Sequence, residues 1–451
     1  MDTVFLARLQ FAFTIAFHYI FPPLSIGLGV ILVMMEFLYI KTKNKMYERM
    51  TKFWVRIFAL TFAIGVASGI VMEFEFGTNW ATYSRYVGDV FGSALAAEGI
   101  FAFFLESGFL AILLFGWDKV KPGMHFFATI MVSLGSMMSA VWIVVANSWQ
   151  QTPAGYHIVG EGLSARAEIT DFWAMVFNPS SIDRLTHTIS GGWLAGAFMV
   201  MSVSAYYLIK NRHTDIAKSS FKIGLGLAVF ASIFQLMTGH SSASGVARNQ
   251  PAKLAAFEAH YDSLAAGDLY LFGWVDENNK VVNYGVKIPG MLSLLVYCDT
   301  KTPLRGLNSF DPADLPPVNF AFQTYHLMVA IGFALIGLSL LGLFLLWRKK
   351  LFTANWYLKL MIFAVLLPQI ANQIGWFSAE VGRQPWIVYG LLRTSDAVSK
   401  NVEANQILFS LILFGIIYLL LFILFIFLLD QKIKHGPDEE EHVVNESTAR
   451  A

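Results

Sequence analysis

Long apolar runs separated by short polar segments dominate the chain. A helix needs about 20 predominantly apolar residues to cross a bilayer, and nine runs approach or exceed that length. They lie near residues 11–40, 53–76, 91–115, 124–147, 184–209, 219–240, 319–347, 354–377 and 404–429. The pattern therefore predicts an all-α integral membrane protein with nine transmembrane helices.

The distribution of lysine and arginine predicts how these helices are oriented. Basic residues cluster after the first, third, fifth, seventh and ninth helices, whereas the other connections carry few for their length. Because positively charged loops stay on the cytoplasmic side, we expect the N-terminus outside and the C-terminus in the cytoplasm. The chain then divides into a membrane domain, residues 1–435, and an acidic tail, residues 436–451, that we expect to be disordered.

Composition agrees with a membrane protein and restricts how a cofactor could be held. The chain is 56% hydrophobic and 14% charged, whereas soluble domains carry about 25% charged residues. A formal net charge of +1 gives no basis for a nucleic-acid partner. The single cysteine, Cys298, cannot form an internal disulfide, and no Cys-x-x-Cys-His motif is present for covalent haem attachment. Any cofactor would be held by other side chains.

One outward connection, residues 241–318, is much longer than the others and is rich in Gly, Pro, Asp and Asn. A loop of this length is usually functional or disordered. Residues 252–260 within it read as a short helix that carries Lys253 and Glu258. Without further information, this segment could equally be a solvated helix with unpaired charges.

Several ionisable or ligating side chains lie inside the predicted helices, where they are costly and therefore candidates for function. At a rise of 1.5 Å per residue, His18 and Glu98 lie about 10 Å from the predicted outer ends of their helices, and Met328 about 13 Å. His187 and Glu380 lie at the outer ends of two further helices. Five side chains from five helices thus converge on the outer part of the membrane.

Imidazole and thioether side chains are known axial ligands of haem iron. Oxygen ligands alone would have suggested a hard cation, and thiolates a cluster, so a haem site fits this set best. Taken singly, a buried histidine or methionine is explained as well by helix packing, and only the shared depth favours ligation by His18, His187 and Met328. We expect Glu75 to be interfacial and His125 to be solvated beside a loop.

Glu106 lies eight residues beyond Glu98, so it is about 12 Å deeper and rotated by about 80° around an ideal helix. Burial could keep this carboxyl protonated and inert. With Glu98 above it and Ser107 beside it, a proton relay from the cytoplasm is the favoured interpretation. Arg383, three residues after Glu380, would at its simplest form a surface ion pair worth about 0–1 kcal/mol.

At this point several motifs resemble one family. They are Gly375-Trp376 with Glu380-Val-Gly-Arg-Gln-Pro-Trp386, Met72-Glu-Phe-Glu-Phe-Gly-Thr-Asn-Trp80, Ala97-Glu-Gly, Phe104-Leu-Glu-Ser107, Ala146-Asn-Ser-Trp-Gln-Gln-Thr-Pro153, and His18 ahead of Pro22-Pro23. Together they resemble subunit I of the cytochrome bd-type quinol oxidases, in the branch with a short outer loop. The similarity runs from the first predicted helix to the ninth.

The resemblance implies three haems and their axial ligands. His187 and Met328 would hold a low-spin haem b, and His18 and Glu380 would each hold one of two high-spin haems. The high-spin pair would be a haem b and a haem d, or a further haem b in place of haem d. Which of the two sites would hold the d-type haem stays open.

The resemblance also implies roles for the remaining candidates. Glu98 and Glu106 match carboxylates near the high-spin pair and on the proton route, and Lys253 and Glu258 match residues of quinol oxidation on the outer loop. Arg383 would neutralise haem propionates or the charge of Glu380, since guanidinium groups suit carboxylates. In a departure from many relatives, His326 stands where they carry arginine, which makes it a rival ligand and alters the charge near the low-spin haem.

The implied activity is oxidation of ubiquinol or menaquinol at the outer face coupled to reduction of O2 to water. It would be electrogenic, with protons taken from the cytoplasm. The implied partners are a second membrane subunit, a small single-span subunit and membrane lipid, in a bacterial or archaeal-type cell membrane. Two alternatives stay open: a proton- or ion-coupled transporter, and a haem subunit that relays electrons without reducing oxygen.

Overall fold

The computed structural model describes residues 2–438, and within them the prediction of an all-α protein with nine transmembrane helices is confirmed. In this part of the chain, nine helical segments are long and apolar enough to cross a membrane. They are α1 (Thr3–His18) with α2 (Phe21–Thr42), α3 (Lys45–Thr78), α5 (Gly88–Glu98) with a π-helix (Gly99–Phe103) and α6 (Phe104–Phe115), α7 (Pro122–Gln151), α9 (Ser181–Ile209), α10 (Thr214–Asn249), α13 (Val318–Trp347), α14 (Asn355–Ala364) with α15 (Leu366–Val381), and α17 (Ala404–His435).

Several helices extend beyond the apolar runs that predict them. The first begins at Thr3, where the Asp2 side chain accepts hydrogen bonds from the backbone N–H groups of Val4 and Phe5 at 3.1 and 3.3 Å. His18 therefore lies about 22 Å along its helix, and the depth predicted for it used the wrong starting residue. The same span breaks directly after His18, because the prolines Pro22 and Pro23 lack the N–H groups that a continuous helix would need.

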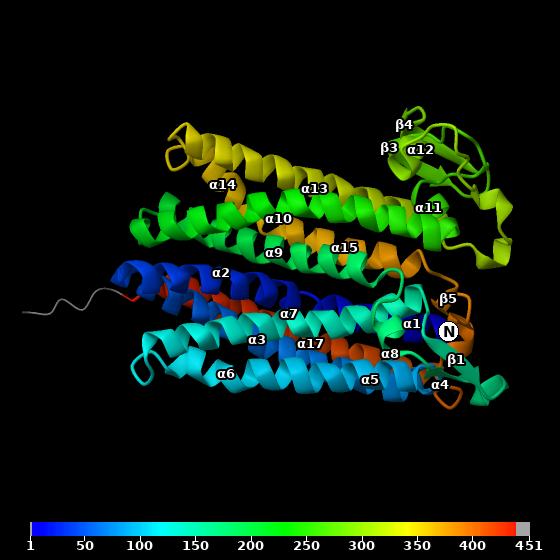
Figure 1. Cartoon of the computed structure of the whole chain (residues 1–451), viewed down its shortest axis with the longest axis horizontal. Coiled ribbons are helices and arrows are strands. Elements are labelled where there is room, and N and C mark those ends of the chain that lie inside the picture. Colours follow the sequence, from blue (N-terminus) through cyan, green and yellow to red (C-terminus); the bar gives the residue numbers. More distant parts are fainter. Residues whose placement is uncertain (1, 439–451) are drawn as a thin grey trace, which may run out of the picture.

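The membrane helices form two groups that lie side by side (Figure 1). In the first group, α9, α10, α13 and α15 form a closed ring in which each helix packs against two others of the ring. The second group contains α1, α2, α3, α5, α6, α7 and α17. Contact between α2 and α9 is the main junction of the two groups, with further contacts of α7 with α9 and of α10 with α2 and α3.

Glycines allow α2 and α9 to cross with their backbones in direct contact. A Cβ atom added to Gly27 would lie 2.3 Å from the carbonyl oxygen of Gly192, and one added to Gly196 would lie 2.4 Å from the carbonyl carbon of Gly27. Small residues at such a crossing are typical of membrane helix pairs, since close backbone approach supplies the packing. This crossing sets the distance between the two groups.

The short strands and accessory helices gather at the end of the molecule where the N-terminus lies, and the short connections lie at the other end (Figure 1). Three antiparallel pairs occur there among the described residues. The elements are β1 (Tyr156–Val159) and β2 (Arg166–Ile169), β3 (Leu269–Asp276) and β4 (Val281–Ile288), β5 (Trp386–Val388) and β6 (Leu392–Arg393), with α4 (Ala81–Tyr86), α8 (Phe172–Val176), α11 (Pro251–Phe257), α12 (Met291–Tyr297) and α16 (Thr394–Ala397). We refer to this end as the outer end, following the predicted orientation.

The long outer connection is folded. Residues 241–249 continue α10, and the rest forms α11, the β3–β4 hairpin and α12 before α13 begins at Val318. Helix α17 finishes at the inner end, as an odd number of crossings requires. The acidic tail predicted for residues 436–451 lies mainly outside the described residues, since these stop at residue 438.

Replacing Gly196 with alanine should lower the thermal unfolding midpoint, because the added methyl group cannot fit against Gly27 without separating α2 from α9. Overpacking of this kind costs about 1–3 kcal/mol. Gly226 in α10 is the matched control, since a Cβ atom added there meets nothing within 4 Å. Unfolding followed by tryptophan fluorescence in detergent measures both variants. Equal midpoints for Gly196→Ala and Gly226→Ala would contradict the crossing.

Candidate functional site

The carboxylate of Glu380 in the last turn of α15 is the centre of a buried polar cluster. The Arg383 guanidinium donates to its Oε2 atom, and the side chain of Arg383 is only 4% exposed. The Oε1 atom accepts from Asn147 Nδ2 at 3.0 Å and from Gln151 Nε2 at 3.2 Å. The reading of Glu380 and Arg383 as a surface ion pair is therefore wrong, because both groups are covered by the end of α7 and by the chain after α15.

Two further basic side chains reach the same cluster. Arg184, in the first turn of α9, donates to Asn147 Oδ1. Lys253 of α11 is buried, and its Nζ atom donates to Gln151 Oε1 at 2.9 Å and to the Ala379 carbonyl at 2.7 Å. Burial and the nearby Arg184 charge hold the pKa of Lys253 well below its ordinary value. The amides of α7 thus bridge one carboxylate and several basic groups.

The charges in this cluster do not balance. Two guanidinium groups and one lysine surround the single carboxylate of Glu380. Arg184 and Lys253 also line a narrow cavity together with the carboxylate of Asp183, so the basic groups still outnumber the acidic ones. The Nε atom of Arg184 has no hydrogen-bond partner among residues 2–438. The cluster therefore suits an additional negatively charged group, and carboxylates pair well with guanidinium donors.

The ring of α9, α10, α13 and α15 carries His187 and Met328. The Nδ1 atom of His187 lies 3.2 Å from Thr238 Oγ1, and its Nε2 atom lies 3.0 Å from Gln235 Nε2. Met328 on α13 lies against Gly375 of α15, where an added Cβ atom would be 2.6 Å from the sulfur. One closed bundle therefore contains an imidazole and a thioether, the donor set of a low-spin haem.

His18 ends α1 in the other group of helices. Its Nδ1 atom lies 3.0 Å from Ser68 Oγ on α3, and its ring lies over Gly69, where an added Cβ atom would be 3.2 Å from Cε1. Gln373 of α15 donates to the Ala16 carbonyl at 2.7 Å, so the helix that carries Glu380 also contacts the turn before His18.

Glycines recur opposite these candidate ligands. Gly69 lies opposite His18, Gly375 opposite Met328, and Gly239 opposite His187, where an added Cβ atom would be 3.3 Å from Cε1. Each glycine lets the candidate ligand pack directly against the backbone of a neighbouring helix, which fixes the position of that side chain. Positioned imidazole and thioether groups, together with the excess of basic groups around Glu380, are the chemistry that a haem with its propionates requires.

Glu98 and Glu106 both turn toward α7. Ser139 donates to Glu98 Oε1 at 2.7 Å, and Ser136 donates to Glu106 Oε1. The π-helix between the two carboxylates accommodates one extra residue in its turn, which reduces their expected separation from about 80° to about 20°. Ser107, expected beside the relay, instead bonds to the Phe103 carbonyl of its own helix.

Lys253 and Glu258 are both buried, so the interpretation of their segment as a solvated helix is wrong. They face different neighbours: Lys253 reaches the Glu380 cluster, whereas Glu258 lies 3.8 Å from His326 of α13. Among the residues that the structure describes, Glu258 Oε2 has no hydrogen-bond partner. Burial raises the pKa of Glu258 to about 8.

His326 has both ring nitrogens in polar contacts. Its Nδ1 atom lies 2.9 Å from the Phe322 carbonyl and its Nε2 atom 2.9 Å from the Tyr270 carbonyl. The ring also stacks on Phe322 with a centroid distance of 3.9 Å. These contacts orient the imidazole toward the β3–β4 hairpin and oppose its use as a rival iron ligand.

From the sequence, no role was assigned to Arg184, and two buried side chains, Glu75 and His125, were placed at the surface. Arg184 received no role, although it lies three residues before His187 and so on nearly the same helix face. Glu75 and His125 were expected at the surface, yet each is 1% exposed. Thr14 donates to Glu75 at 2.6 Å, and His125 lies 2.7 Å from a second buried carboxylate, that of Glu36. Covering helices, which no local pattern reveals, account for both corrections.

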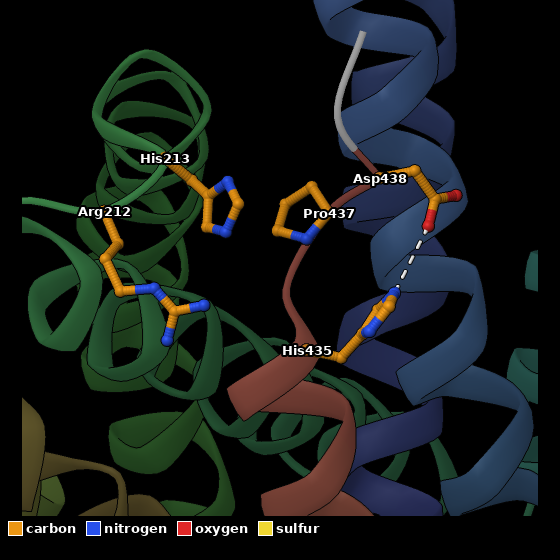
Figure 2. Close-up of a pocket in the computed structure, with 5 residues that line it drawn as sticks. All are labelled: Arg212, His213, His435, Pro437 and Asp438. Atoms are coloured by element: carbon orange, nitrogen blue, oxygen red, sulfur yellow. Dashed lines mark ion pairs between the residues drawn. The ribbon is translucent and has the colours of Figure 1, made fainter. Parts of the chain in front are cut away.

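An open cavity lies at the inner end of the molecule, far from this cluster. It is formed by Arg212, His213, His435, Pro437 and Asp438, between the α9–α10 turn and the end of α17 (Figure 2). His435 and Asp438 form an ion pair at 3.6 Å, and Asp438 also pairs with Arg56 of α3. No predicted site residue lines it.

Comparison with known proteins places the chain. A family model described as cytochrome bd terminal oxidase subunit I matches residues 6–437. The chain is 40% identical to the cytochrome bd ubiquinol oxidase subunit 1 of Bacillus subtilis, over 98% of this chain and 96% of that protein. It is 34% identical to the cytochrome bd-II ubiquinol oxidase subunit 1 of Escherichia coli, over 97% of each.

A solved structure agrees. The bd oxidase from Geobacillus thermodenitrificans contains a chain that superposes with a TM-score of 0.91 at 28% sequence identity, covering 97% of this chain and 99% of that chain. The region that the family model matches contains eight of the nine described spans whole and the first from residue 6 onward. The chain belongs to the cytochrome bd terminal oxidase subunit I family.

Proposed function

We propose that this chain is the haem-carrying subunit of a quinol:oxygen oxidoreductase in a bacterial cell membrane. The observation that carries the proposal is the buried cluster at the outer end, where Arg184, Arg383 and Lys253 surround Glu380. The names of the curated relatives, ubiquinol oxidases, support a quinol as the reductant. Nine apolar spans support a multi-pass membrane location.

The haems would be held by residues of both helix groups. His187 and Met328 would hold a low-spin haem b, while His18 and Glu380 would each hold a high-spin haem, one of type b and one of type d or again b. When bound, these haems supply the electron path from quinol to O2. The guanidinium groups of Arg184 and Arg383, together with Lys253, would bind propionate carboxylates, which suits the positive charge in excess around Glu380.

Quinol oxidation would take place beside α11. Glu258 would accept a proton from the quinol, since its carboxyl is buried and its Oε2 atom lacks a partner among the described residues. Lys253 would orient the substrate or neighbouring propionates through its ammonium group. Protons released at this outer end would leave the membrane domain, residues 1–435, through the outward segment 241–318.

Protons for water formation would come from the inner end through Glu106 and Glu98. Each carboxylate accepts a hydrogen bond from a serine of α7, so the two groups lie along one helix. Uptake inside and release outside makes turnover electrogenic without a pump, and each charge moved against 100 mV stores about 2.3 kcal/mol. The partners would be a second membrane subunit, a small single-span subunit and membrane lipid.

Replacing His187 with alanine should abolish the low-spin haem signal in the reduced spectrum while leaving high-spin absorbance. The reason is that the proposed high-spin ligands lie on α1 and α15. His157→Ala on the exposed β1 strand is the control, and it should leave the spectrum unchanged. An unaltered low-spin signal in His187→Ala would overturn the ligand assignment.

Glu258→Gln should remove a pH dependence from quinol oxidation. A carboxyl with a pKa of about 8 is protonated below pH 8 and becomes a proton acceptor above it, so the wild-type rate should rise with pH and level off above 8. The variant should be slower by about 100-fold, a typical general-base contribution, and flat across this range. Steady-state rates from pH 6 to 9.5 test this, with Glu168→Gln on β2, a half-buried carboxylate paired with Arg166, as control. A retained rise in the Glu258→Gln profile would contradict the role.

Glu106→Gln should slow oxygen reduction by roughly tenfold or more, because a glutamine cannot pass a proton. Haem content should stay the same, as the Ser136 hydrogen bond can be kept by the amide oxygen. Oxygen uptake with quinol measures the rate, and Glu73→Gln at an exposed position of α3 is the matched control. Wild-type turnover in Glu106→Gln would eliminate the relay.

A further inference from the structure

A second buried carboxylate near the inner end has no role in the function described so far. Glu36 of α2 is 1% exposed, and its Oε1 atom lies 2.7 Å from His125 Nδ1 of α7. The Thr129 hydroxyl, one turn further along α7, donates to the other oxygen of Glu36. We call Glu36, His125 and Thr129 the inner cluster.

The inner cluster holds a shared proton. The Nε2 atom of His125 lies 3.2 Å from the carbonyl of Leu113, an acceptor only, so this nitrogen carries a hydrogen. Nδ1 and Glu36 Oε1 must then share one further proton, either as a carboxylic acid facing a neutral imidazole or as a carboxylate facing an imidazolium. Both forms keep every hydrogen bond, so the proton can cross between Glu36 and His125 without a change in their positions.

This cluster lies just beneath the inner surface. The Trp117 ring, from the α6–α7 connection, covers the His125 ring at a centroid distance of 3.9 Å. The Lys52 ammonium lies 5.0 Å from the centre of the Trp117 ring on its way to solvent. Trp117 therefore contacts both His125 and a lysine of the basic inner face.

From the inner cluster, hydroxyl groups continue along one side of α7 toward Glu106. Thr129 and Ser136 are seven residues apart, which places them within about 20° of each other and about 10 Å apart along the axis. Ser133 lies between them and is 3% exposed. It faces α2, where a Cβ atom added to Gly29 would be 3.1 Å from its Oγ atom.

The same side of α7 thus meets three carboxylates in sequence. Thr129 donates to Glu36, Ser136 to Glu106 and Ser139 to Glu98. If the inner cluster served only to fasten α2 to α7, apolar side chains of similar volume would be as good or better, since burying charged or polar groups carries a desolvation cost. A carboxyl, an imidazole and a hydroxyl are instead the groups that transfer protons near neutral pH.

We propose that the inner cluster is the entry of the proton path to Glu106. Glu36 first releases the shared proton toward Glu106, and a proton from the inner face then replaces it between His125 Nδ1 and Glu36 Oε1, while Nε2 keeps its hydrogen. Glu36 passes a proton to the Thr129 hydroxyl, which gives up its own toward Ser133 and Ser136, and Glu106 receives one. Each hydroxyl gains and loses one proton and the inner cluster is refilled, so the net change is one proton moved from the inner face to Glu106. The inference rests on the proposed function, in which Glu106 and Glu98 supply protons for oxygen reduction.

The test uses Glu36→Gln in the complete oxidase, reconstituted in vesicles with a pH indicator at the inner side of the protein. The amide keeps an acceptor for Thr129 but cannot hold the shared proton. Turnover and inner-side proton uptake should fall together by about fivefold or more, and the solvent deuterium isotope effect on turnover should increase. The haem spectrum and the thermal midpoint should stay at their wild-type values.

Two further variants separate the possible explanations. Glu48→Gln is the matched control, because Glu48 also lies at the inner end but pairs with Lys45 and Lys52 and contacts no residue of the inner cluster that we describe. Thr129→Val removes one hydroxyl with little change in shape, and it should also slow uptake. If the Glu36→Gln oxidase does not assemble, proton uptake by Thr129→Val tests the inner cluster in its place.

The outcomes distinguish this inference from the function on which it rests. Wild-type uptake in Glu36→Gln and Thr129→Val, with slow uptake in Glu106→Gln, would place the entry elsewhere and overturn the inner cluster while the relay stands. A lower thermal midpoint with unchanged uptake would show that the inner cluster only fastens helices. Unchanged uptake in all three variants would remove the relay itself.

Discussion

The cost of burying charge in an apolar helix bundle governs the outer end of this protein. The Glu380 side chain is only 16% exposed. Its burial is tolerated because Arg383, Asn147 and Gln151 donate hydrogen bonds to its two oxygens. Arg184 and Lys253 then add two further basic groups, so that the basic groups around Glu380 outnumber the carboxylates, Asp183 beside the cavity included. Burial, and secondarily the Arg184 charge, lowers the pKa of Lys253. A bound group with carboxylates would relieve this excess of basic groups, which is why we propose this cluster, and not the open inner cavity, as the place for a cofactor.

Helix α7 organises the polar groups of the membrane interior. Its outer end supplies Asn147 and Gln151 to Glu380, and its middle supplies hydroxyl groups to Glu98 and Glu106. Its inner end carries the contacts to Glu36. Because the single continuous helix α7 carries all three sets of contacts, the helix rise fixes the spacing between them. The π-helix beside it adjusts the two carboxylates of the neighbouring span to the same side.

Much of this organisation could be predicted from the sequence, and the exceptions have physical reasons. Apolar length alone gave the nine spans, and motif residues such as Glu380 were recognisable because ionisable groups are rare at such positions. The burial of Glu75 and His125 could not be predicted, since each looks like a helix-end residue until another helix covers it. Nor could the joint orientation of Glu98 and Glu106, which depends on a π-helix with no local sequence signal. Arg184 was detectable by its spacing from His187. Buried carboxylates alone would also suit a transporter. The candidate imidazole and thioether ligands are what favours a haem protein over a transporter.

The central claim is that the described residues hold one low-spin and two high-spin haems. A reduced-minus-oxidised spectrum of the purified oxidase, with pyridine haemochrome analysis and with carbon monoxide added to the reduced protein, measures this most directly. The haem assignment predicts a Soret band, a low-spin b-type signal that carbon monoxide leaves unchanged, and high-spin absorbance that shifts when it binds. A protein without a Soret band, or one whose entire spectrum is insensitive to carbon monoxide, would contradict it.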